Sequence, residues 1–193
     1  MSKRTALLSA AAFGALALTA TIVAPVQAKD KMMKSEMSGE KTVMVGGAAM
    51  YPSKNIVQNA VNSKDHTTLV AAVKAAGLVD TLSGPGPFTV FAPTNAAFGK
   101  LPKGTVEKLV KPENKAALTK ILTYHVVPGK LESSDLTDGK KLKTVEGETL
   151  TVKHSGGKIW IVDAKGDKAQ VTIPNVNQSN GVIHVVNKVL LPK

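Results

Sequence analysis

The residue types that could carry chemistry are few in this 193-residue chain. It has no cysteine to serve as a nucleophile or metal ligand, and no serine stands in a Gly-x-Ser-x-Gly turn. The histidines form neither an i, i+4 pair nor a His-Glu-x-x-His motif; they are His66, His125, His154 and His184. We therefore expect a protein that is not an enzyme, with no catalytic residue, no cofactor and no metal site.

Tyr124 and His125 are the first candidate interaction residues. They stand between a helical stretch and the turn Pro128-Gly129, within a predicted strand at 124–127. The pair could form a recognition element, or His125 could be a hydrogen-bonded histidine that locks this strand in place. Their position between a helix and a Pro-Gly turn favours the structural role.

Trp160, the single tryptophan, is the third candidate. It lies between Ile159 and Ile161 in a predicted hairpin strand, so it must face away from both isoleucines. If the isoleucines face the core, Trp160 is partly exposed and could stack against a sugar ring. Otherwise it is an ordinary core residue.

The chain is basic, with a net charge of +11. Without Lys3 and Arg4, 23 basic and 14 acidic residues remain, a net charge of +9. A charge of this size favours anionic partners such as acidic polysaccharides or membrane surfaces, but the lysines are dispersed, which favours a simple solubility role. The basic residues form no stripe with interleaved aromatics, so we expect no nucleic-acid partner.

The N-terminus predicts export. Two basic residues, an Ala- and Leu-rich run and the small-residue site Val26-Gln27-Ala28 are typical of a signal peptide over residues 1–28. We expect cleavage before Lys29, no permanent membrane span, and a periplasmic, cell-surface or extracellular location. The style of the signal and the single domain favour a bacterial protein.

Residues 29–51 read as a flexible, methionine-rich linker, with mostly charged and small side chains and no sustained period. Thioethers could hold Cu(I), but their irregular spacing, without cysteine or histidine among them, favours a spacer. The folded domain is then predicted to span residues 52–193.

The elements that must position these candidates follow an α+β order, with helices before Tyr124 and strands after it. The central stretch is 88–101, in which a buried strand stops at Pro93 and Thr94 or Asn95 caps a short helix. Gly77 is expected to end the preceding helix. Further strands are predicted at 149–153, 158–162, 169–173 and 182–191, with a polar loop at 175–181.

Three blocks in this order resemble the fasciclin-like (FAS1, beta-Ig-H3/fasciclin) family. They are FTVFAPTNAAF at 88–98, the Tyr124-His125 pair, and NGVIHVVNKVLLP at 180–192. The resemblance implies the FAS1 fold, a β-sandwich-like wedge with several helices packed around it.

The resemblance also implies a secreted, non-catalytic module for cell adhesion or contact with a cell-surface or matrix protein. In animal members an Asp-Ile adhesion motif precedes the last block, whereas this chain reads IPNVNQSNG there. The alternative function is a periplasmic protein that binds a small lipid or carbohydrate.

Overall fold

The computed structural model describes residues 41–193. Its helices, including two 3-10 turns labelled η, are α2 (Ile56–Ala60), η2 (Lys64–His66), α3 (Thr67–Ala76), α4 (Val79–Ser83), α5 (Asn95–Phe98), α6 (Thr105–Leu109), η3 (Pro112–Asn114) and α7 (Lys115–Tyr124). Its strands are β1 (Val43–Val45), β2 (Ala48–Met50), β3 (Phe88–Pro93), β4 (Val126–Pro128), β5 (Lys141–Lys143), β6 (Thr149–Ser155), β7 (Lys158–Val162), β8 (Lys168–Gln178) and β9 (Gly181–Val186). The α+β order predicted from the sequence is confirmed.

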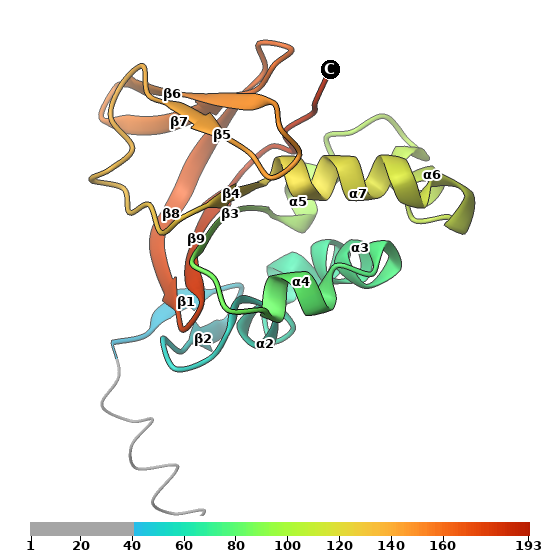
Figure 1. Ribbon diagram of the computed structural model, residues 1–193, viewed down its shortest axis with the longest axis horizontal. Coiled ribbons are helices and arrows are strands. Elements are labelled where there is room, and N and C mark those ends of the chain that lie inside the picture. The colour runs from blue at the N-terminus through green and yellow to red at the C-terminus, as the bar shows by residue number, and fades with distance from the viewer. Residues whose placement is uncertain (1–40) are drawn as a thin grey trace, which may run out of the picture. The chain divides into compact units, whose positions relative to one another are not determined.

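Seven strands form one sheet in the order β4-β3-β9-β8-β7-β6-β5. All neighbours are antiparallel except β3 and β9, which are parallel in register from Phe88–Gly181 to Pro93–Val186. The two edge strands of the sheet, β4 and β5, approach each other. Val145, just after β5, donates its N–H to the carbonyl of Val126 in β4 at 2.8 Å. The sheet is therefore close to a barrel. In Figure 1, β5, β6 and β7 lie at the top of the view and α2, α3 and α4 at the bottom, with α7 between them.

The strand β3 is buried on both faces because these faces belong to two different cores, and its one hydroxyl side chain, Thr89, donates to the Gly129 carbonyl. Val90 and Ala92 join β9 residues Ile183 and Val185 in a cluster covered by α2, α3, α4 and α7. Phe91 faces the other way, into a second cluster inside the curved part of the sheet. A strand buried on both faces is mostly apolar rather than strictly alternating, in agreement with the buried strand predicted here.

The stop after β3 also matches the prediction. The strand ends at Pro93, and the Thr94 hydroxyl accepts from Ala97 N–H at 3.3 Å to cap α5. The helix α3 ends at Gly77, whose φ of 72° supplies the left-handed C-cap.

The domain begins earlier than the predicted boundary at residue 52. Strands β1 and β2 form an antiparallel hairpin, and Val45 and Met50 are each only 3% exposed. Gly46 and Gly47 make the tight turn of this hairpin with positive φ, rather than marking a flexible spacer. Residues 29–40 of the predicted linker, and the predicted signal peptide, lie outside the described residues.

Three strand boundaries also differ from the prediction, and one of them is the end of β9, which lies at Val186 rather than at residue 191. Tyr124 is the last residue of α7 rather than a strand residue, and His125 N–H still bonds the Leu122 carbonyl at 3.1 Å. The strand β8 continues to Gln178, through Pro174 and into the loop predicted at 175–181. Its pairing with β9 skips from Ile173 to Val176, so Pro174 is tolerated at a bulge where no ladder N–H is needed.

Candidate functional site

Asn95, the asparagine of the first signature block, bonds to the beginning of another helix. Its Oδ1 accepts from Thr68 N–H at 3.0 Å, and its Nδ2 donates to the Lys64 carbonyl at 2.8 Å. The residue at the N-cap of α3, His66, makes no side-chain capping bond. Asn95 therefore caps α3 from outside that helix, while its neighbour Thr94 caps α5.

Asn180, which opens the last signature block, has the same role for two other helices. Its Oδ1 accepts from Ile56 N–H at 3.0 Å, in the first turn of α2. Its Nδ2 donates to the carbonyls of Leu82 and Gly84, at 2.8 and 2.9 Å, where α4 ends. One side chain therefore joins the start of α2, the end of α4 and the strand β9.

His125 is 2% exposed, and both of its ring nitrogens are bonded to the backbone. Nδ1 lies 2.8 Å from the Ile121 carbonyl, and Leu190 N–H donates to Nε2 at 3.0 Å. These partners require the neutral tautomer with the proton on Nδ1. Burial lowers the pKa of His125 to about 4, although the Ile121 carbonyl and the charge of Asp163 act in the opposite direction.

Tyr124 is completely buried, and its phenol oxygen accepts from Ala164 N–H at 2.8 Å. Burial raises the pKa of Tyr124 to about 12. Together Tyr124 and His125 join α7 to the turn after β7 and to the C-terminal segment. In this position neither side chain can contact a partner directly, and their structural role remains our prediction.

His184, in the middle of β9, is completely buried beside Phe91, its register partner in β3. Their ring centroids are 5.7 Å apart, with the rings inclined by 26°. Nε2 lies 2.7 Å from the Leu131 carbonyl, and Nδ1 accepts from Asn175 N–H at 3.3 Å. Burial lowers the pKa of His184, although the Leu131 carbonyl and the charge of Glu132 act in the opposite direction, and a ring whose Nδ1 accepts from Asn175 N–H is neutral.

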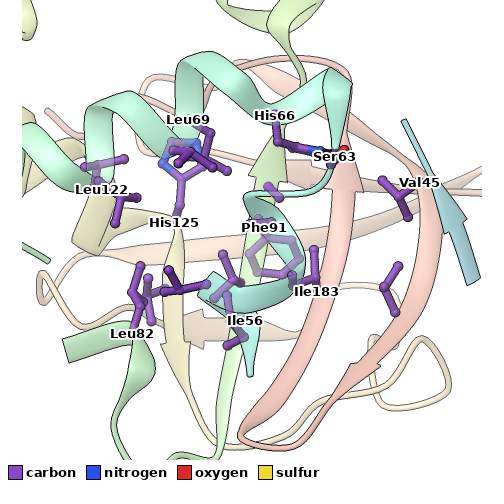
Figure 2. Close-up of a pocket in the computed structure, with 18 of the residues that line it drawn as sticks. Val45, Ile56, Ser63, His66, Leu69, Leu82, Phe91, Leu122, His125 and Ile183 are labelled. Carbon is purple, nitrogen blue, oxygen red and sulfur yellow. Dashed lines mark hydrogen bonds between the residues drawn. The ribbon is translucent and has the colours of Figure 1, made fainter. Parts of the chain in front are cut away.

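An apolar cavity of about 50 Å³ lies among β3, β9, α2, α3 and α4. Figure 2 shows His66, Leu69 and His125 along one side of it, and Ile56 and Leu82 along the other. A space of this size accommodates water-sized molecules, but not a sugar ring or an acyl chain in the observed conformation.

His66, in the wall of this cavity, is the one polar side chain there with an unpartnered atom among the described residues. It is 3% exposed, Nδ1 lies 2.9 Å from the Ser63 hydroxyl, and Nε2 has no hydrogen-bond partner with acceptable geometry. Burial lowers the pKa of His66, and the nearby Ala92 carbonyl and Asp65 charge partly offset this effect. Over residues 41–193, no three His, Asp or Glu side chains are grouped so as to hold a metal ion.

Trp160 lies apart from Tyr124 and His125, on the outward face of the sheet. Its neighbour Ile161 is completely buried inside the sheet, whereas Trp160 is half-buried and its indole N–H donates weakly to the Ser155 carbonyl at 3.4 Å. The candidate residues predicted from the sequence therefore divide into a buried pair and a surface residue, and they do not form one site.

Sequence reasoning missed the structural importance of Asn95, Asn180 and Asp163. The Asp163 carboxylate is 6% exposed and accepts from the backbone N–H groups of Lys165, Asp167 and Leu191, at 3.0, 2.8 and 3.0 Å. The position of each asparagine inside a signature block was an available signal. Asp163 lies in no signature block, and one of its partners, Leu191, is 28 residues away, so no local pattern indicated its role.

The sequence profile of the Fasciclin domain matches residues 64–192. Protein sll1483 from Synechocystis sp. is 52% identical over 153 residues, which cover 79% of this chain and 82% of that protein. Immunogenic protein MPB70 from Mycobacterium bovis is 38% identical over 138 residues, covering 69% of this chain and 66% of that protein. Human periostin is 31% identical over 137 residues, covering 70% of this chain but only 16% of periostin.

The fold agrees with these sequence matches. A solved FAS1 domain pair from fasciclin I, described as an insect cell adhesion molecule, superposes with a TM-score of 0.64 at 19% identity. The match covers 79% of this chain and 58% of the domain pair. No helix within residues 41–193 is both long and apolar enough to cross a membrane. With the profile matched over most of the folded residues and the sheet and helices in the same arrangement, this chain belongs to the Fasciclin domain family.

Proposed function

We propose that the chain is exported and works by contact, as a non-catalytic module that attaches a cell to another surface or to a matrix component. One observation carries the proposal: the histidines and asparagines of the signature blocks are bonded inside the domain. Asn95, Asn180 and His184 all bond to backbone groups of other elements. Function must then depend on the outer surface, as expected for a contact module.

The relatives support this reading. Fasciclin I is named as a cell adhesion molecule, and a glycolipoprotein of Mycobacterium bovis, MPB83, is named as a cell-surface protein. MPB83 is 36% identical over 153 residues, covering 77% of this chain and 64% of that protein. Adhesion and surface location are the properties that we carry over to this chain.

Attachment of whole cells tests the proposal. A strain that lacks the gene should attach less to a solid surface than the parent strain, and the complete gene should restore attachment. Unchanged attachment of the deletion strain would contradict the contact role. Export is tested separately by N-terminal sequencing of the mature protein, which should begin at Lys29.

A second candidate function is the binding of a small apolar ligand, which the cavity beside His66 favours. Because the space is about 50 Å³, α2 and α4 would have to move apart to admit a fatty acid. Titration with a fluorescent fatty acid tests this candidate. Saturable binding at one molecule per chain would support it. The absence of binding would reject it, and the contact function would be the one remaining candidate.

A further inference from the structure

The strands β5 to β8 present an outward face with an unusual composition. We call it the lysine face and define it by its five lysines and its tryptophan: Lys141, Lys143, Lys153, Lys158, Lys168 and Trp160. These residues come from four strands, but the strand register brings them together. Lys153 is paired with Trp160, and Trp160 with Gln170. A neighbouring row of paired residues crosses all four strands, from Lys141 through Thr151 and Val162 to Lys168.

Burial confirms that these side chains share the outer face. The alternate residues on the same strands face the interior of the sheet: Leu142, Leu150, Val152, Ile161 and Ala169 are each no more than 3% exposed. Directly paired residues on neighbouring strands point to the same side of a sheet, so the lysines and Trp160 must point outward together.

The charge of this face is not neutralised by the protein. The strands β5 to β8 contain no Asp or Glu. None of the five lysines forms an ion pair with a described residue; the lysines that do are Lys111, Lys120, Lys130 and Lys188. Five like charges on one small face repel one another, so the face is complementary in charge to an anionic partner.

We propose that the lysine face binds an acidic polysaccharide, with its carboxylates on the lysines and one sugar ring stacked on Trp160. This inference rests on the contact function proposed above and names the class of partner. The half-buried indole offers an apolar platform at the centre of the lysines, and aromatic rings of this kind pack against the C–H face of a sugar. A hydroxyl and an amide group for the sugar hydroxyls stand on neighbouring strands, on Thr151 and on Gln170, the residue paired with Trp160.

The dimensions of the face indicate a chain rather than a single sugar. Lys141 and Lys168 lie in one row, three strand spacings apart, which is about 14 Å at the usual distance between paired strands. A monosaccharide cannot reach both ends of this row. A polymer with one carboxylate per sugar unit can meet several lysines at once, and the weak individual contacts then add up.

An anionic membrane is the less suitable partner. Membrane-surface binding combines basic residues with large apolar side chains that enter the lipid. The exposed large hydrophobic residues of the described chain are Met44, Val61 and Val145, and none of them belongs to β5, β6, β7 or β8.

The test uses the chain without its predicted signal peptide, residues 29–193, with polygalacturonate as the probe. Neutral dextran and phosphatidylglycerol vesicles are the comparison ligands. The site variant is Lys153→Gln/Lys168→Gln, and the matched control is Lys103→Gln/Lys108→Gln, which removes the same charge from an exposed loop and helix α6. Thermal melts verify that all variants are folded.

We expect the site variant to bind polygalacturonate about tenfold more weakly at physiological salt, and the control to change affinity less than about threefold. Trp160→Ala should weaken binding by about tenfold while the net charge is unchanged. Because Trp160 is the only tryptophan, its fluorescence should shift on binding of polygalacturonate and not with dextran.

Three outcomes would overturn the inference. Equal losses in the site and control variants would mean diffuse attraction to the whole basic protein. Binding to the vesicles but not to polygalacturonate would assign the face to a membrane. No binding to either ligand, in a protein that still restores cell attachment, would reject the polysaccharide and leave the contact function standing.

Discussion

The parallel pair β3/β9 and the lysine face belong to the same sheet but use their polar side chains in opposite ways. Around β3 and β9, Asn95, Asn180 and His184 are bonded to backbone groups of other elements. On the lysine face, the five cations have no anionic partner among residues 41–193. The first region holds the fold together, and the second leaves its polar groups available to a partner.

The comparison separates two kinds of substitution. A change around β3 and β9 acts on folding first, so a resulting loss of attachment would carry no information about recognition. A change on the lysine face leaves the hydrogen bonds of the fold intact, so it can alter binding alone. The predictions below test this separation by measuring stability, and they run from the largest expected effect to the smallest.

Substitution of Gly181 should have the largest effect. A Cβ at Gly181 would lie 2.0 Å from the Phe88 carbonyl oxygen, in the backbone of the paired strand β3. Since neither strand can move without breaking the parallel pair, Gly181→Ala should lower the free energy of unfolding by about 3 kcal/mol or more. Urea unfolding measures this value.

The control for this substitution is Gly99→Ala. A Cβ at Gly99 meets only ordinary contacts, the nearest at 3.5 Å, and the backbone there is right-handed helical. We expect a change within about 0.5 kcal/mol. Equal stability of the Gly181 and Gly99 variants would show that the close approach of β9 to β3 is not rigid.

Acid should destabilise the domain through its buried histidines. The pKa of His125 is about 4 in the folded protein and ordinarily 6.5, so the unfolded chain binds a proton that the folded chain excludes between these values. The stabilisation by neutral His125 is complete above pH 6.5 and is lost as the pH falls toward 4. The loss is about 3 kcal/mol for this group alone, and His66 and His184 act in the same direction.

Urea unfolding at pH 7.5 and pH 5 measures the effect, and His125→Asn assigns it. This variant should lose about 1–3 kcal/mol at pH 7.5, because Leu190 N–H is left without its acceptor. Its stability should then depend less on pH than that of the wild type. The same pH dependence in both proteins would exclude His125 as a major cause.

Removal of the Asn180 side chain should cost about 1–3 kcal/mol, since three backbone groups of α2 and α4 lose their partner. Asn62→Ala is the matched control, because Asn62 makes one exposed hydrogen bond, to the Gln58 carbonyl, within its own segment. The control should be nearly neutral. Thermal melts of both variants decide the matter, and equal melting temperatures would count against a joining role for Asn180.

The smallest effect is expected on the lysine face. Lys168→Gln should change the free energy of unfolding by less than about 0.5 kcal/mol, because the side chain is exposed and forms no ion pair with a described residue. A slight stabilisation is the expected sign, since like charges are separated. A loss above about 1 kcal/mol in a melt would show that this lysine also supports the fold.

Much of the fold could be predicted from local patterns. The stop at Pro93, the Thr94 cap and the Gly77 C-cap depend on the conformational limits of single residues, and these limits do not change with context. The order of helices and strands followed from the change of hydrophobic period along the chain. The β1/β2 hairpin was missed because its strands are only three residues long, too short for a period to be visible.

The amino-acid sequence by itself determined which residues cap, stop and fill the elements, because those effects act over a few residues. Only the tertiary structure decided which distant residues meet. Ile56 and Asn180 are 124 positions apart, and Lys141 and Lys168 share a row only through the pairing of four strands. Strand register is set by how all the apolar faces are buried together, so neither the joining role of Asn180 nor the lysine face can be read from a local pattern.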